Sequence, residues 1–142
     1  MVTFGNSFEF ATEAFNLKVA DVTSDLSPTE WFCPGSTLKV NFDNSHPLAY
    51  GMPEEGVVLN YSSPVFEVIP GRQNDDYTTV ARYKEQNLLK SGWLIGEKTA
   101  AKKQAMLTVK YGEGEIVLIG FRAQHRNQTD GTFKLLFNTI IR

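Results

Sequence analysis

One segment of the sequence constrains the fold more than any other. Residues Ala105–Tyr111 alternate between apolar and polar side chains, and the turn-forming Gly112-Glu113-Gly114 leads into Glu115–Phe121. Within the second strand, Ile116-Val117-Leu118-Ile119 is apolar without interruption, which is typical of a strand that is covered on both faces. The chain must therefore place a layer of structure on each side of this strand, and the fold class that we expect is α/β.

A helix is predicted to follow this hairpin. Beyond the polar loop that begins at Arg122, apolar side chains recur at positions i, i+3, i+4 and i+7, namely Phe133, Leu136, Phe137 and Ile140. This spacing is that of an amphipathic helix, and Asp130 or Thr132 is its expected N-cap. The spacing predicts that the chain ends in a helix packed on the apolar strand.

The chain begins with another strand, turn and helix. Val2-Thr3-Phe4 has the pattern of a strand, Gly5-Asn6-Ser7 forms a turn, and apolar residues then recur at helical spacing at Phe8, Ala11 and Phe15. Asn6 is the expected N-cap, with Glu9 three residues later as in a capping box. Because such a strand normally follows other βα units, we expect residues 1–142 to be a single domain that forms the C-terminal part of a larger one.

The middle of the chain is predicted to be rich in β structure. Period-two alternation and the spacing of Pro and Gly indicate four strands, at 37–42, Val57–Tyr61, Val65–Ile69 and Tyr77–Tyr83. We expect residues 21–35 to form a loop with one helical turn at Ser27–Glu30, and residues 87–103 to form a loop with a short helix. The expected architecture is a partial α/β sheet with helices and a β-rich middle section.

Charge and composition exclude several classes of function. The 14 basic and 16 acidic side chains give a net charge of −2, with no run of Lys or Arg longer than Lys102-Lys103, so nucleic acid has no electrostatic footprint here. No apolar stretch approaches the roughly 20 residues of a membrane span. The single cysteine, Cys33, is expected in an apolar niche, and His46 is expected in a turn. Together with His125 they have no zinc-ligand spacing, so we expect no metal and no cofactor in this chain.

Two polar loops follow strands at positions where an α/β sheet binds ligands. They are Gly5-Asn6-Ser7, after the first strand, and 122–128, after the apolar strand. With Ser7 as nucleophile and His125 as base, the chain would be a small hydrolase. The candidates to hold an anionic or amide-bearing ligand are Asn6, Arg122, Gln124 and Arg126. In the structural alternative, Ser7 only starts a helix and His125 is hydrogen-bonded within its loop.

Five segments together resemble one group of proteins. They are 32–36 (Phe-Cys-Pro-Gly-Ser), 46–53 (His-Pro-Leu-Ala-Tyr-Gly-Met-Pro), 91–96 (Ser-Gly-Trp-Leu-Ile-Gly), 114–121 (Gly-Glu-Ile-Val-Leu-Ile-Gly-Phe) and 124–138. These segments are similar to the C-terminal region of bacterial zinc carboxypeptidases of the carboxypeptidase A type, and the similarity spans nearly the whole chain. The resemblance implies a class I glutamine amidotransferase-like, flavodoxin-like domain that follows a peptidase domain in a secreted or periplasmic protein.

The resemblance also implies that this domain has no catalytic activity of its own. The peptidase's zinc motif, H-x-x-E, has no counterpart, because neither His46 nor His125 has Glu three residues later. Zinc is therefore expected only in the peptidase domain of the parent protein. The amidotransferase pattern has a nucleophilic Cys where this chain has Gly5-Asn6-Ser7, and its His-Pro-Glu is replaced by His125-Arg126-Asn127. We expect a non-catalytic accessory domain that serves in packing, oligomerisation or substrate presentation.

The expected partners are proteins. If upstream units are missing, the first strand presents an uncovered apolar sheet edge, and such edges pair with other chains. We therefore expect self-association through the N-terminal strand or the face that it leaves bare, or contact with the upstream peptidase domain. Nucleic acid and membranes are not expected partners.

Overall fold

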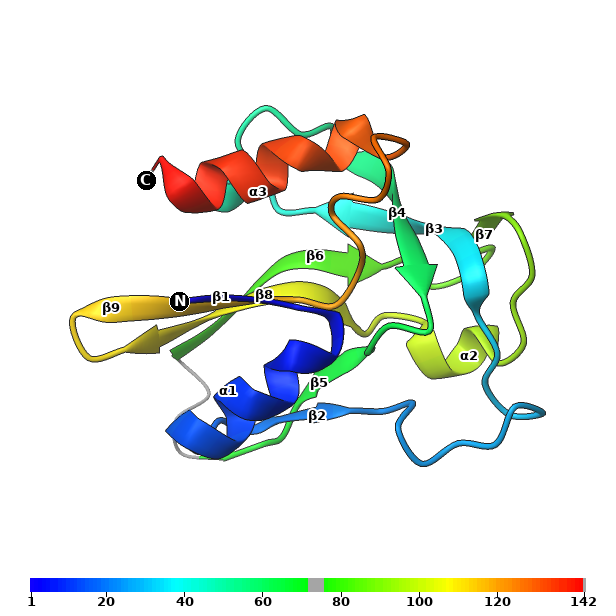
Figure 1. Cartoon of the computed structure of the whole chain (residues 1–142), viewed down its shortest axis with the longest axis horizontal. Coiled ribbons are helices and arrows are strands. Elements are labelled where there is room, and N and C mark those ends of the chain that lie inside the picture. The colour runs from blue at the N-terminus through cyan, green and yellow to red at the C-terminus, as the bar shows by residue number, and fades with distance from the viewer. Residues whose placement is uncertain (72–75, 142) are drawn as a thin grey trace.

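The computed structural model describes residues 1–71 and 76–141, which form a mixed α/β fold around a nine-stranded sheet (Figure 1). The strands are β1 (Val2–Phe4), β2 (Val19–Asp21), β3 (Pro34–Phe42), β4 (Glu55–Tyr61), β5 (Phe66–Val68), β6 (Tyr77–Tyr83), β7 (Leu89–Ser91), β8 (Gln104–Tyr111) and β9 (Gly114–Ile119). The helices are α1 (Phe8–Phe15), α2 (Glu97–Ala100) and α3 (Phe133–Ile140), with short 3₁₀ helices η1 (Gly5–Ser7), η2 (Pro47–Ala49) and η4 (Asp130–Thr132). The expected fold class is thereby confirmed.

The order of the strands places two carboxyl ends side by side. The main path of the sheet runs β1-β9-β8-β6-β3-β4, and β5 and β7 attach to it through β8 and β3. Strand β1 is parallel to β9, whereas β8 and β9 form the antiparallel hairpin that the sequence predicts. Because β1 and β9 run in the same direction, the loops that follow them leave the same edge of the sheet.

Strand β9 is covered on both faces, as its uninterrupted apolar sequence predicts. Val117 and Ile119 belong to the larger hydrophobic cluster, and Ile116 and Leu118 belong to a smaller one. Helix α1 supplies buried side chains to the smaller cluster. Helix α3 and the 3₁₀ helix η2 supply buried side chains to the larger cluster. Helices α1 and α3 therefore lie on opposite sides of the sheet (Figure 1).

The predicted helix near the N terminus is confirmed, but the predicted N-cap at Asn6 is wrong. The chain turns into η1 directly after Phe4, and α1 follows from Phe8. Ser7 closes this turn: its Oγ donates a hydrogen bond to the Phe4 carbonyl oxygen at 2.6 Å and accepts one from the Phe4 N–H at 3.0 Å. The cap is thus placed one residue later than the sequence pattern indicates.

The predicted C-terminal helix is confirmed, with Thr132, one of its two expected N-caps, in that position, but its buried face differs from the prediction. Leu135 is fully buried, whereas Phe137 and Ile140 are 56% and 68% exposed. The helix packs mainly on η2, where the Asn138 side-chain amide donates to the carbonyl oxygens of Leu48 and Tyr50. Phe133 and Leu136 of the predicted stripe are half-buried, so the stripe lies at the edge of the buried face and not at its centre.

The middle of the chain is as rich in strands as predicted, with two corrections. Strand β3 begins at Pro34, within the segment expected to be a loop, and β2 just before that segment is not foreseen by the sequence pattern. Within 87–103 the structure has β7 as well as the short helix α2. Both short strands are held by pairing with strands that are remote in the sequence, β2 with β5 and β7 with β3. None of the described helices is long and apolar enough to cross a membrane.

Candidate functional site

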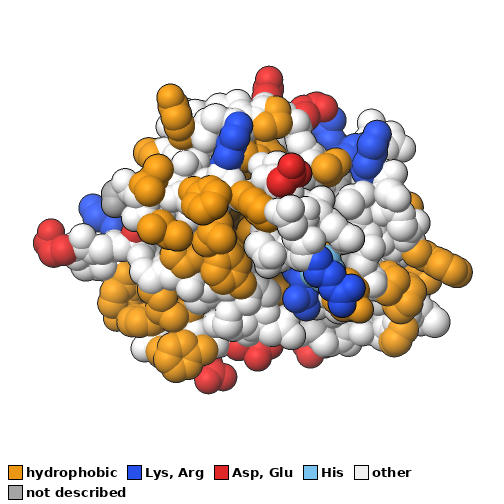
Figure 2. Space-filling model, turned by 45° about the horizontal axis from the view of Figure 1, so that its top comes forward, with side chains coloured by type: hydrophobic (Ala, Val, Ile, Leu, Met, Phe, Trp, Pro, Cys, Tyr) orange, Lys and Arg blue, Asp and Glu red, His pale blue; other side chains and the backbone are white. Residues whose placement is uncertain are grey.

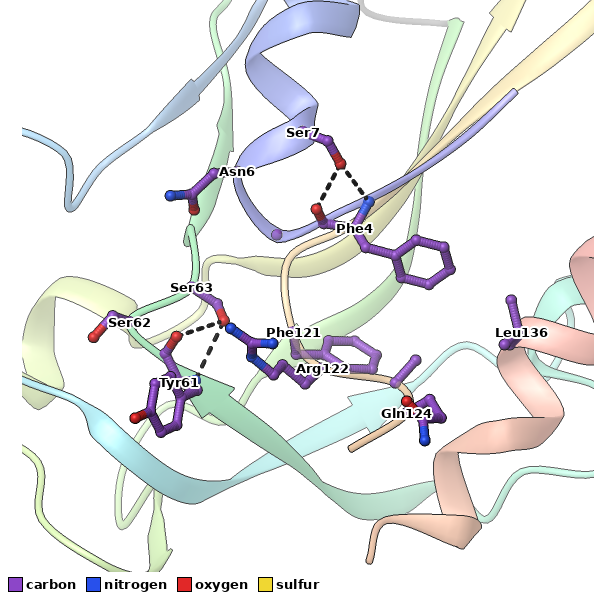
Figure 3. Close-up of a pocket in the computed structure, with 12 residues that line it drawn as sticks. Phe4, Asn6, Ser7, Tyr61, Ser62, Ser63, Phe121, Arg122, Gln124 and Leu136 are labelled. Carbon is purple, nitrogen blue, oxygen red and sulfur yellow. Dashed lines mark hydrogen bonds between the residues drawn. The ribbon is translucent and has the colours of Figure 1, made fainter. Parts of the chain in front are cut away.

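A pocket of about 650 Å³ lies where the loops after β1 and β9 meet (Figure 3). Its lining residues come from four parts of the chain, namely Phe4, Gly5, Asn6 and Ser7; Tyr61, Ser62 and Ser63; Phe121, Arg122, Ala123 and Gln124; and Leu136. Phe4, Phe121 and Leu136 form the apolar part of the wall. The strand-end rule therefore locates this pocket, because both predicted loops line it.

The turn after β4 is the part of the pocket that sequence analysis does not foresee. Strand β4 is not next to β9 in the sheet, but the Arg122 N–H donates to the Leu59 carbonyl oxygen at 2.9 Å and holds the two segments together. Gly35, with a φ of +125°, lets the Tyr61 ring approach, because a Cβ there would lie 2.8 Å from that ring. The only local signal for this turn is the Tyr61-Ser62-Ser63-Pro64 sequence at the end of a strand.

A buried asparagine holds this turn in shape. The Asn60 side chain accepts a hydrogen bond from the Ser63 N–H at 3.1 Å and donates to the Ser63 carbonyl and to the Tyr83 hydroxyl at 3.3 and 3.2 Å. The Ser63 hydroxyl in turn accepts from the Tyr61 N–H and donates to the Tyr61 carbonyl. Burial raises the pKa of Tyr83, which therefore stays neutral within this network. The pocket wall at Tyr61 is thus rigidly supported from the core.

Arginine, tyrosine and histidine side chains stack at the rim of the pocket. The Arg122 guanidinium lies 5.2 Å from the centroid of the Tyr61 ring, and the His125 ring stacks on Tyr61 with centroids 6.2 Å apart and planes inclined by 22°. A cation over an aromatic face is attracted by the ring quadrupole. No carboxylate occurs among the twelve residues that line the pocket, so its electrostatic character is positive.

The structure brings most of the predicted site residues to the pocket, but it places His125 beside the pocket and Arg126 in the turn beyond it. Asn6, Ser7, Arg122 and Gln124 line the pocket, and His125 lies beside it on Tyr61. Arg126 lies in the turn beyond, where the Gln128 N–H donates to the His125 carbonyl oxygen. The Ser7 hydroxyl points to the Phe4 backbone, as Figure 3 shows. The predicted Ser7 and His125 pair remains a prediction.

The remaining titratable candidates lie outside the pocket. Cys33 is buried, as expected, and burial raises the pKa of its thiol. His46 occupies the expected turn, where its Nδ1 accepts a hydrogen bond from the Leu48 N–H at 3.2 Å. Within residues 1–71 and 76–141, no three His, Cys, Asp or Glu side chains gather into a group that could hold a metal ion.

The fold of this chain is similar to that of class I glutamine amidotransferase-like proteins. It is similar to the crystal structure of a GMP synthase component from Thermoplasma acidophilum, with a TM-score of 0.58 and 16% sequence identity. That match covers 98% of this chain but 54% of the other, so this chain spans about half the length of its structural neighbour. A likeness at this identity shows the fold alone.

A second solved structure, a ThuA-like protein from Bacteroides uniformis, matches with a TM-score of 0.42 and 12% identity over 78% of this chain and 45% of that one. No protein-family model and no curated protein sequence matches the chain.

Proposed function

We propose that this chain is a non-catalytic accessory domain that serves a zinc carboxypeptidase-like protein through packing, oligomerisation or substrate presentation. The geometry of Ser7 carries the non-catalytic part of the proposal. Ser7 lies in the turn where the amidotransferase pattern has its nucleophile, yet its hydroxyl both donates to and accepts from the Phe4 backbone. A serine hydroxyl is a weak nucleophile unless a base takes its proton, and here a carbonyl oxygen holds that proton.

The link to a carboxypeptidase rests on the resemblance of the five segments, and two of them are in direct contact. Phe32 forms an isolated β-bridge with Ile95, and the Ser36 hydroxyl donates to the Trp93 carbonyl at 2.6 Å and accepts from the Trp93 N–H at 2.8 Å. Residues that resemble the family in 32–36 and 91–96 therefore build one structural unit. Such a unit supports a shared fold over this region.

A bare apolar surface supports the roles in packing and oligomerisation. Figure 2 shows hydrophobic side chains gathered on the face that carries α3. We call this surface the α3 patch and define it as Phe137, Ile140 and Ile141, with Leu136 and Phe4 next to them at the pocket. Contiguous exposed apolar patches of this kind mark contacts with other proteins.

The free edge of β1 has few backbone groups available to pair with a strand of another chain. The Met1 carbonyl accepts from the Val117 N–H at 2.8 Å, so Met1 and Thr3 direct their backbone groups to β9, and Val2 and Phe4 direct theirs to the open side. Ser7 already satisfies both backbone groups of Phe4. Only Val2 is left to pair with another strand, so association is expected through the α3 patch.

Active-site labelling tests the non-catalytic part of the proposal. The purified chain is treated with a fluorophosphonate probe, which labels activated serines, with Ser7→Ala as the matched control. We expect no labelling of Ser7. Labelling that disappears in Ser7→Ala and in His125→Ala would refute the proposal and identify a hydrolase.

The reading frame upstream of codon 1 tests the link to a carboxypeptidase. A continuous frame that encodes an H-x-x-E peptidase motif is the expected result. A separate gene without such a frame would refute this part of the proposal.

A ligand-binding domain or small hydrolase is the second candidate function. It is favoured by one observation, the gathering of Asn6, Ser7, Arg122 and Gln124 around a single pocket. The labelling experiment separates a ligand-binding domain from a hydrolase, because the probe leaves Ser7 unlabelled in the first and labels it in the second.

A further inference from the structure

The pocket carries a cation without a counter-charge. Each ion pair of the described residues lies elsewhere, in Lys84–Glu55, Lys102–Glu85 and Lys103–Glu67. The Arg122 guanidinium stacks on Tyr61 and pairs with no carboxylate among the described residues. The Tyr61 ring attracts the guanidinium, whose N–H donors form no hydrogen bond within the described part of the chain and can bind a carboxylate with two hydrogen bonds.

Some neutral polar side chains of the pocket already form hydrogen bonds within the protein, and others do not. The hydroxyls of Ser7 and Ser63 bond to backbone groups within their own turns. The side-chain amides of Asn6 and Gln124 and the hydroxyl of Ser62 form no hydrogen bond within the described part of the chain. They lie in the lining together with Arg122 (Figure 3) and can supply further donors to an anion.

The rest of the pocket wall is apolar, so it favours an anion that carries an apolar group. Phe121 is fully buried, Phe4 is 42% exposed and Leu136 is half-buried, and all three line the same pocket as Arg122. A volume of about 650 Å³ is ample for an amino-acid side chain with its adjoining peptide. No lining carboxylate is present to pair with a free amino group, so a zwitterion fits less well than a blocked or peptide-linked residue.

We propose that this pocket binds a carboxylate that carries a large apolar group, with the C terminus of a peptide ending in an aromatic or branched residue as its source. Arg122 holds the carboxylate, Asn6 and Gln124 add hydrogen bonds, and Phe4, Phe121 and Leu136 contact the side chain. The inference rests on the proposed accessory function, because it gives substrate presentation a defined ligand.

Titration with three matched tripeptides tests the ligand class. The probes are Ala-Ala-Phe, its C-terminal amide and Ala-Ala-Ala, and binding is followed by amide chemical shifts in NMR spectra of the full chain. We expect shifts at the residues of the pocket for Ala-Ala-Phe and at least about tenfold weaker binding of the amide, since a charged hydrogen-bond pair is lost. Equal binding of acid and amide, or of Phe and Ala peptides, would overturn the inference. Octanoate that binds more tightly than Ala-Ala-Phe would overturn the peptide source.

Substitution of the cation tests the assigned residue. Arg122→Gln is expected to weaken Ala-Ala-Phe binding about tenfold, because the amide keeps a donor but loses the charge. Lys110→Gln, an exposed substitution on β8 outside this pocket, is the control and should bind as the unaltered chain does. Unchanged affinity in Arg122→Gln would overturn the assignment.

The two proposals fail separately. Absence of peptide binding leaves packing and oligomerisation standing, because neither role needs the pocket. Labelling of Ser7 refutes the accessory role even where the peptide binds.

Discussion

Replacement of Asn60 by alanine should destabilise the protein strongly, because this side chain holds the turn at the pocket to the core. Asn60 is fully buried and makes three hydrogen bonds, two with the Ser63 backbone and one with the Tyr83 hydroxyl. Ser63 and Tyr83 are themselves 5% and 1% exposed, so water cannot replace the lost partner. Each buried group left without a partner costs about 1–3 kcal/mol.

The expected loss of unfolding free energy for Asn60→Ala is about 3–5 kcal/mol. This value is the sum of the costs of the groups left unpaired, each taken from the lower part of that range. This is a large share of the roughly 5–15 kcal/mol by which a domain is stable. Urea unfolding followed by circular dichroism measures the change. The same measurement should show no loss for Asn41→Ala beyond about 0.5 kcal/mol, since Asn41 is exposed on β3 and its side chain has no hydrogen bond within the described residues.

A small effect would refute this reasoning. If Asn60→Ala costs no more than Asn41→Ala, the turn is held by something other than the Asn60 network. If Asn60→Ala does not fold, Tyr83→Phe removes only one hydroxyl and gives the milder test. A loss of about 1 kcal/mol is expected there, and no loss would contradict the role of the Tyr83 hydroxyl.

Two further outcomes concern charge and association. Because burial raises the pKa of Tyr83 in the folded state, the unfolded chain ionises first, near pH 10, and stability should fall as the pH rises above that value. Urea titrations from pH 8 to 11 should show this fall, and Tyr83→Phe should reduce its slope; an unchanged slope would contradict the assignment. Light scattering at tens of micromolar should show a dimer or larger species that Ile140→Lys converts to a monomer, with Glu9→Lys on α1 as control. A monomer of the unaltered chain would refute association through the α3 patch.

Local pattern was sufficient for the β8–β9 hairpin, for the bounds of β6 and for the existence and N-cap of α3. In each case the period of the side chains and the adjacent turn residues lie within one short segment. The buried face of α3 was not predictable in the same way. Phe137 and Ile140 follow the helical period, yet Leu135 is buried, because Asn138 binds carbonyl groups in and beside η2, some ninety residues away.

Some residues of the candidate site were likewise predictable from the local sequence, and others were not. Asn6, Ser7, Arg122 and Gln124 were predictable, because the ends of parallel strands in an α/β sheet meet at one edge. Tyr61 was not, since β4 is remote from β9 in the strand order and reaches the pocket through one backbone hydrogen bond between Arg122 and Leu59.

By itself, the sequence determined that this chain forms an α/β sheet with one strand covered on both faces and polar loops at the ends of two strands. Only the tertiary structure decided that Ser7 bonds to the Phe4 backbone, that the Arg122 guanidinium lies over the Tyr61 ring and that Phe137 and Ile140 of α3 face outward. The physical reason is the range of the interactions. Periodicity and turn chemistry act between neighbours in the chain, whereas these three features depend on how the packed backbone aims each side chain.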